Sequence, residues 1–173
     1  MEHTMGDKVS ILVVDDKPDN LRLLNELLGN KGYEIRLASN DEVALESANL
    51  ALPDIVLLDI NMPGMDGYEV CRRLKEIPGF GDTPVIFVSA LSDIGVKVNA
   101  FKNGGVDYIT KPIEAEELHA RIETHLSLAR LRKESREQYE ELRHLEGLRD
   151  RLVKMLAHDI RGIYLWFPAR YPC

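Results

Sequence analysis

Five short runs rich in β-branched and aromatic residues alternate with helix-like segments over the first two thirds of the chain. The runs occupy residues 9–14, 34–38, 54–58, 84–89 and 106–110. Several are continuously apolar, as expected for strands that are covered on both faces. Five β/α units in succession predict an α/β fold, with a parallel sheet, right-handed crossovers and helices on both faces. Binding chemistry is expected at the carboxyl ends of the strands.

Helix start signals lie between these runs. Pro18 suits the first position of a helix, and Asn40 can cap a second one. Asp66 with Glu69 resembles the capping box of a third. A fourth helix is expected to start at residue 92 or 93, and a fifth after Pro112.

Composition excludes several classes of protein. The net charge of −7 argues against a general affinity for nucleic acid or for an anionic membrane. Cys71 and Cys173 suggest neither a disulfide framework nor a zinc site, so a cytoplasmic location is expected. The chain has no apolar run long enough for a bilayer, and residues 1–8, MEHTMGDK, read as a polar leader and not as a signal peptide.

Chemically reactive side chains lie at the carboxyl ends of four of the predicted strands. Asp15 and Asp16 end the first strand, Asp59 the third, Ser89 the fourth and Lys111 the fifth. If the first and third strands are neighbours, three carboxylates share a small volume and raise one another's pKa unless a cation lies between them. Mg²⁺ is the expected cation, because it binds carboxylate and phosphate oxygens.

The same inventory points to phosphoryl transfer. Lys111 supplies a positive charge and Ser89 a hydroxyl beside Asp59, a carboxylate nucleophile. Each residue taken alone also has an ordinary structural explanation, such as a helix cap, a turn or a surface lysine. Their joint placement at four strand ends on one edge favours the phosphoryl-transfer site.

Four segments then carry a family resemblance. ILVVDD, IVLLDINMPGMDG, VIFVSA and YITKP, in this order and spacing, resemble the receiver domain of two-component response regulators over residues 9–125. The resemblance implies a flavodoxin-like sheet of five strands in the order 2-1-3-4-5. It also implies that the domain catalyses its own phosphorylation and dephosphorylation.

The resemblance assigns the acceptor and the metal ligands. It implies that Asp59 accepts a phosphoryl group from a phosphohistidine donor, either a sensor kinase or a phosphotransfer protein. Mg²⁺ would be bound by Asp16 and Asp59 directly, by Asp15 often through water, and by the backbone carbonyl of Asn61.

The resemblance assigns the switch residues as well. Lys111 would contact the phosphoryl oxygens, and its bond to Pro112 would be cis. Ser89 would turn toward the new phosphate, and Tyr108 would swing inward as it does so. Ala90 is small and would leave the site open to the donor. The face made by the fourth helix, the fifth strand and the fifth helix would change on phosphorylation.

A long helix is predicted to continue from the fifth helix, because no proline interrupts residues 114–158 and Gly147 is the only glycine there. Six leucines fit one 3–4 heptad register: Leu128, Leu131, Leu142, Leu145, Leu152 and Leu156. Three polar residues interrupt the same seam: Ser135, Gln138 and Arg149. We expect residues 126–157 to form a coiled-coil homodimer, with a solvated charged helix as the alternative.

The last segment, residues 158–173, is less regular. LVKMLAHDIRG, at residues 152–162, resembles the phosphoacceptor helix of histidine kinases, with His158 as the phosphorylated histidine and Asp159 as its acid/base neighbour. The kinase pattern has a proline where Ile163 stands. The alternative is an ordinary histidine near a helix end. The aromatic stretch IYLWFPARYPC is either a truncated, frameshifted or vector-encoded tail or an apolar docking segment.

Three interpretations of the whole chain follow. The first is a phosphorelay switch with a dimeric stalk, cut from a receiver–histidine kinase protein. The second is a stand-alone adaptor that regulates oligomerisation or partner docking. The third is a fragment of a receiver–cyclic-dinucleotide synthase. No nucleotide-binding motif follows the stalk, so this chain alone is not expected to make phosphohistidine from ATP.

Overall fold

The computed structural model describes residues 8–64 and 66–166, with the helical backbone alone for residues 162–166. Residues 1–7 of the expected leader and residues 167–173 of the aromatic tail lie outside the described part. The chain divides into two compact units, with the boundary between Ala129 and Arg130.

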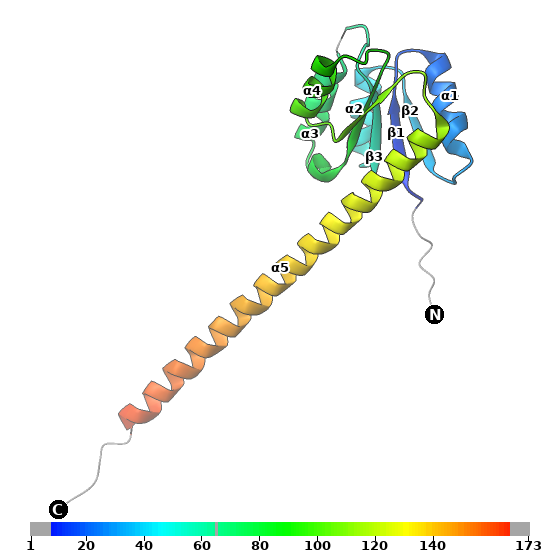
Figure 1. Ribbon diagram of the computed structural model, residues 1–173. Helices are drawn as coiled ribbons and strands as arrows, with labels where there is room; N and C mark the ends of the chain where they lie inside the picture. The colour runs from blue at the N-terminus through cyan, green and yellow to red at the C-terminus, as the bar shows by residue number, and fades with distance from the viewer. Residues whose placement is uncertain (1–7, 65, 167–173) are drawn as a thin grey trace, which may run out of the picture. The chain divides into compact units, whose positions relative to one another are not determined.

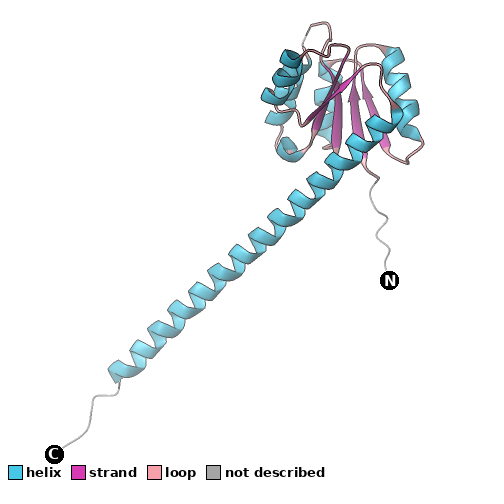
Figure 2. Ribbon diagram, viewed as in Figure 1, coloured by secondary structure: helices cyan, strands magenta, loops and turns pink. Residues whose placement is uncertain are grey.

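The first unit contains a five-stranded parallel sheet in the order β2-β1-β3-β4-β5, which confirms the predicted fold class (Figure 2). The strands are β1 (Ser10–Val14), β2 (Glu34–Ala38), β3 (Ile55–Asp59), β4 (Val85–Ser89) and β5 (Asp107–Thr110). The register pairs Val14 with Leu58 and Asp59 with Val88, so the carboxyl ends of the central strands are level. The residues that follow these strands therefore meet at one edge of the sheet.

Helices cover both faces of the sheet (Figure 1). They are α1 (Pro18–Gly29), α2 (Asp41–Leu50), α3 (Gly67–Glu76), α4 (Ile94–Lys102) and α5 (Ala115–Trp166), with a short 3-10 turn, η1 (Phe80–Asp82), before β4. One core cluster joins the sheet to α1 and to the first turns of α5, through Leu24, Leu118 and Ile122. The other joins it to α2, α3 and α4.

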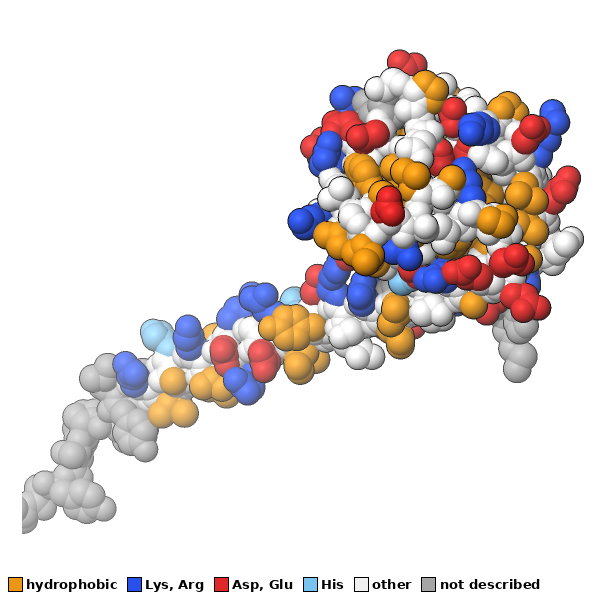
Figure 3. All heavy atoms as spheres, turned by 45° about the horizontal axis from the view of Figure 1, so that its top comes forward, with side chains coloured by type: hydrophobic (Ala, Val, Ile, Leu, Met, Phe, Trp, Pro, Cys, Tyr) orange, Lys and Arg blue, Asp and Glu red, His pale blue; other side chains and the backbone are white. Residues whose placement is uncertain are grey.

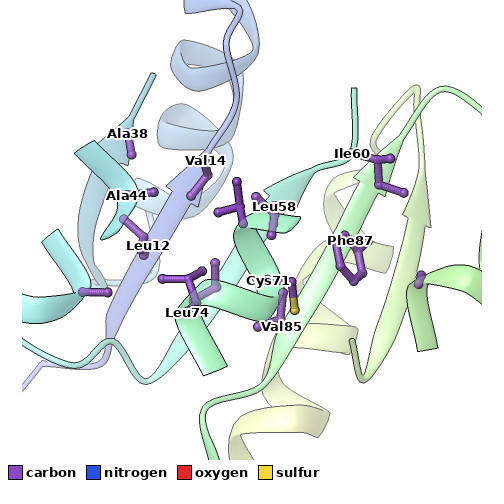
Figure 4. Close-up of a cluster of buried hydrophobic side chains, with 14 of the residues drawn as sticks. Leu12, Val14, Ala38, Ala44, Leu58, Ile60, Cys71, Leu74, Val85 and Phe87 are labelled. Atoms are coloured by element: carbon purple, nitrogen blue, oxygen red, sulfur yellow. The ribbon is translucent and has the colours of Figure 1, made fainter. Parts of the chain in front are cut away.

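The second cluster is drawn in Figure 4. Leu12 and Leu58 of the strands face Cys71 and Leu74 of α3, and all four side chains are buried. Neighbouring residues of each strand point to opposite faces, so a continuously apolar strand contributes to both clusters. Burial also raises the pKa of the Cys71 thiol to about 11, which keeps it protonated at neutral pH.

The helix caps explain where the chain turns. The side chain of Asn40 accepts a hydrogen bond from the backbone N–H of Val43, and Asp66 accepts one from Glu69 at 2.8 Å. In a full capping box the Glu69 carboxylate would also accept a hydrogen bond from the backbone N–H of Asp66. Here it accepts hydrogen bonds from Arg72 and Arg73 instead. The residue that caps α4 is Asp93, although its side chain makes no capping bond.

α5 is one continuous helix of 52 residues. It packs on the sheet as far as Leu126, its last buried residue among those whose side chains are described. Its backbone remains helical through Trp166, past Gly162, where the sequence indicated a change of character. None of the described helices is long and apolar enough to cross a bilayer.

Candidate functional site

Three carboxylates and one lysine meet at the carboxyl edge of the sheet. Asp15 and Asp16 follow β1, Asp59 is the last residue of β3, and Lys111 follows β5. One oxygen of each aspartate lies within 4.8 Å of the others. The Nζ atom of Lys111 lies 3.0 Å from Asp59 Oδ1 and 3.0 Å from Asp15 Oδ2. The peptide bond between Lys111 and Pro112 is cis.

The surroundings of Asp59 disfavour the ionised form of its side chain. Its side chain is only 5% exposed. Burial raises the pKa of Asp59, and the nearby charges of Asp15 and Asp16 raise it further, while Lys111 acts in the opposite direction. For Lys111, burial disfavours the charged form, but the hydrogen bonds to Asp15 and Asp59 outweigh it and raise the pKa of the ammonium. The site therefore holds a permanent cation beside an aspartate that is costly to ionise.

Asp15 already has partners for both of its oxygens. Oδ1 accepts hydrogen bonds from the backbone N–H of Lys17 and from the side chain of Asn20, and Oδ2 accepts from Asn20 and Lys111. The role of Asn20 was not predicted from the sequence. Its position in the first turn of α1, five residues after Asp15, is the one signal that could have revealed it.

Asp16 is the carboxylate that still has an oxygen free to bind a ligand. Its Oδ1 atom is buried, and within the described residues it has no hydrogen-bond partner. A buried, unpaired carboxylate oxygen is unfavourable unless a ligand completes it. With two further carboxylates within 4.8 Å, the donor set consists of hard oxygen atoms and fits a divalent cation such as Mg²⁺.

Ser89 lies close to this cluster but is engaged elsewhere. Its Oγ atom is fully buried and accepts hydrogen bonds from the Leu91 N–H at 3.2 Å and from Asn61 Nδ2 at 3.4 Å. Among the bonds between described residues, none joins its hydroxyl to Asp59 or Lys111. Ala90, the next residue, is exposed beside the buried Ser89.

Tyr108, on β5, lies inward. The residue is 6% exposed, and within the described part of the chain its buried hydroxyl has no hydrogen-bond partner. Lys97 of α4 places its ammonium 5.8 Å from the centre of the Tyr108 ring. Leaving a buried hydroxyl unpaired costs about 1–3 kcal/mol, so this inward position is held against a penalty.

The loop that follows Asp59 returns closely to the strand. The backbone N–H of Gly67 donates to the Ile60 carbonyl at 2.8 Å. A Cβ atom at Gly67 would lie 2.2 Å from the backbone oxygen of Asp59, so only glycine fits there without movement of the backbone. The start of α3 is therefore in direct contact with the end of β3.

His158 belongs to the other unit. Its side chain is 90% exposed, and Nδ1 lies 3.7 Å from Asp159 Oδ1, a neighbour in sequence. In the described chain, this exposed histidine has no buried polar surroundings comparable to those of Asp59.

Comparison with known proteins agrees with this geometry. A family model described as "response regulator receiver domain" matches residues 11–123. The curated protein "Response regulator PleD" of Caulobacter vibrioides is 45% identical over 112 residues, which are 65% of this chain and 25% of that protein. The chain therefore spans much less than the full length of this relative.

Solved structures show the same relationship. NtrX from Brucella abortus matches with a TM-score of 0.69 and 32% identity, over 73% of this chain and 29% of that one. The receiver domain of a signal transduction histidine kinase from Syntrophus aciditrophicus matches with a TM-score of 0.62 and 36% identity, over 68% and 89%. The sheet order, the carboxylate cluster at its edge and these matches agree, and the chain belongs to the family of response regulator receiver domains.

Proposed function

We propose that this chain is a phosphorelay switch that accepts a phosphoryl group on Asp59 from a phosphohistidine donor. The observation that carries the proposal is the placement of Asp59, buried beside Asp15 and Asp16 with the Lys111 ammonium 3.0 Å from its Oδ1. A purely structural carboxylate would not be surrounded by two others at a strand end. An acceptor of a multiply charged group needs this combination of nucleophile and cation.

The chemistry follows from the positions of the side chains. An oxygen of Asp59 attacks phosphorus, an O–P bond forms, the N–P bond of the donor breaks, and the donor histidine leaves. Lys111 stabilises the charge on the phosphoryl oxygens, and the exposed position of Ala90 leaves room for the donor to approach. Asp16, Asp59 and the Asn61 carbonyl would hold Mg²⁺, with Asp15 acting through water. When bound, the ion supplies further charge neutralisation.

Phosphorylation changes the balance of hydrogen bonds around Ser89. The new group has more negative charge and more acceptor oxygens than the carboxylate it replaces. The phosphoryl oxygens offer the Ser89 hydroxyl a strong acceptor, whereas its present partners, the Leu91 N–H and Asn61 Nδ2, are both donors to Oγ. Ser89 therefore turns toward Asp59. Tyr108 is already buried before phosphorylation, so only a small further movement of its ring is needed to fill the space that Ser89 leaves. The result is a population shift between two conformations of the α4–β5–α5 face.

A polar network links this face to the long helix. Asp107 of β5 pairs with Arg121 at 2.6 Å and with His125 at 2.8 Å, and both partners lie on α5. Burial opposes ionisation of Asp107, but its hydrogen bonds to His125, the Tyr108 N–H and Arg121 lower the pKa of the carboxyl overall. Asp107 directly precedes Tyr108 in β5. A movement of Tyr108 would therefore shift Asp107 and, through its two ion pairs, α5.

The long helix would carry the signal as a homodimer. Five leucines of the predicted seam are between 54% and 62% exposed in the single chain: Leu131, Leu142, Leu145, Leu152 and Leu156. Figure 3 shows hydrophobic side chains in the open between charged ones along this helix. A second copy paired through the same seam would cover them.

A chain that ends at Ser127 should remain folded and become monomeric, because it keeps both core clusters and loses the seam from Leu128 onward. Sedimentation equilibrium of the shortened and the full chain at equal concentration measures the change. The same dimer fraction in both would refute pairing through the helix.

His158 suggests a parent protein of the receiver–histidine kinase type. The resemblance of its segment to the kinase phosphoacceptor helix, together with the Syntrophus relative, whose receiver belongs to a histidine kinase, supports this proposal over the adaptor and the cyclic-dinucleotide synthase. A catalytic kinase domain supplied in trans with radiolabelled ATP should produce an acid-labile label that His158→Gln removes. Labelling that survives this substitution, with Asp59 also replaced, would exclude the relay histidine.

Small-molecule phosphorylation tests the central proposal. Acetyl phosphate with Mg²⁺ should add one phosphoryl group, and peptide mapping after borohydride reduction should place it on Asp59. Chelation of Mg²⁺ with EDTA should prevent the reaction. A label on any other aspartate, or none at all, would reject Asp59 as the acceptor.

A further inference from the structure

α4 is weakly attached to the rest of its unit. Among its nine residues, all of which the structure describes, Ala100 alone is buried. Three large apolar residues on the same helix are exposed: Ile94, Val98 and Phe101. A helix with so little buried surface opens more easily than its neighbours, and its position depends on a few specific contacts.

Two of these contacts come from α3. The hydroxyl of Tyr68 donates a hydrogen bond to the Val96 carbonyl in the first turn of α4, at 3.1 Å. The guanidinium of Arg72 donates to Asn103 Oδ1 at the other end, at 2.7 Å. Arg72 is half exposed, so water competes with its bond and weakens it. The Tyr68 contact is partly buried and is the more specific of the two.

Tyr68 is itself firmly placed. Its ring packs against Phe87 of β4, with ring centres 5.3 Å apart and planes inclined by 57°. Burial raises the pKa of Tyr68, and the nearby Tyr108 and Asp66 raise it further, so the hydroxyl stays protonated and can donate. The preceding residue, Gly67, lies against the backbone of Asp59. Tyr68 therefore connects the end of the acceptor strand to α4 through a short, well-packed path.

We propose that Tyr68 is a positioning residue that holds the first turn of α4 in the unphosphorylated conformation. The proposal rests on the switch proposed above. When Ser89 turns toward the phosphoryl group, it gives up the Leu91 N–H, and the loop that leads into α4 moves with it. That loop leads directly to the first turn of α4, where Val96 accepts the Tyr68 hydrogen bond. The hydrogen bond therefore opposes the movement of this turn away from its present position. Removal of the hydroxyl therefore favours the activated conformation.

Tyr68→Phe tests this directly, because it keeps the ring against Phe87 and removes only the donor. Beryllofluoride with Mg²⁺ mimics the phosphoryl group, and its dissociation constant is measured on the full chain. We expect about threefold to tenfold tighter binding, the range that corresponds to one net hydrogen bond. Tyr139→Phe makes the same chemical change at an exposed position on α5 and should leave binding unchanged. Unchanged or weaker binding by Tyr68→Phe overturns the proposal.

A second measurement needs no ligand. Hydrogen exchange of the α4 amides should be several-fold faster in Tyr68→Phe than in the wild type, with exchange in α1 unchanged. Equal exchange in α4 overturns the proposal, whatever the binding result. If the wild type binds no beryllofluoride at all, the proposed phosphoryl switch fails, and faster exchange of α4 still supports the role of Tyr68 as the residue that holds this helix.

Discussion

Asp59→Asn is expected to abolish phosphoryl acceptance completely and to make the fold more stable. The amide oxygen of asparagine is a poor nucleophile, so acetyl phosphate with Mg²⁺ should add no group. The substitution also removes a buried carboxylate that lies within 4.8 Å of two others, and whose pKa is raised mainly by burial. Removal of such functional strain commonly stabilises a protein by about 0.5–2 kcal/mol.

The stabilisation should depend on pH in a defined direction. A raised folded-state pKa means that ionised Asp59 costs stability at neutral pH, and that the wild type recovers this cost as pH falls and the carboxyl takes up a proton. The advantage of Asp59→Asn should therefore be present near pH 7 and shrink in acid. Urea unfolding at several pH values measures it. Asp19→Asn, at an almost fully exposed aspartate in the first turn of α1, is the matched control; it should leave acceptance unchanged and should not stabilise the protein. A phosphorylated Asp59→Asn variant would refute the assignment.

Gly67→Ala is expected to destabilise the protein by about 3 kcal/mol or more, which is the range for severe overpacking. The new Cβ atom would meet the Asp59 carbonyl oxygen at 2.2 Å and the Ile60 Cα at 2.8 Å. Both are backbone atoms, so no side-chain rotation relieves the overlap. Either α3 must move away from β3 or the end of β3 must shift, and a shift there would also disturb Asp59.

Thermal and urea unfolding measure this effect, and Gly95→Ala provides the control. Gly95 lies in α4 with no atom within 4 Å of its added Cβ, so alanine should be neutral or slightly stabilising there. Similar losses for both variants would show that the close approach of Gly67 to Asp59 is not what makes glycine necessary.

Much of the fold could be predicted from local patterns. The five strands begin and end within one residue of the predicted runs, and Asn40 and Asp66 cap α2 and α3 as expected. These predictions succeed because continuous apolar runs and capping side chains act on residues adjacent in the chain. The location of the candidate site was also predictable, because parallel strands bring their carboxyl ends to one edge.

The arrangement of side chains within the site depends on the packing of the whole unit. The sequence did not reveal that Asn20 fills both oxygens of Asp15, that Asp16 keeps an unpaired oxygen, or that Ser89 bonds Leu91. Nor did it reveal the contact of Tyr68 with Val96, 28 residues apart.

The difference between the features that could be predicted and those that could not has a physical cause. Sequence by itself determined the strands, the caps and the edge where the reactive residues collect, because those depend on neighbours in the chain and on strand direction. Tertiary structure alone decided which oxygen lies near which nitrogen. Such pairings depend on how helices from different parts of the chain settle on the sheet, and a movement of one ångström makes or breaks a hydrogen bond.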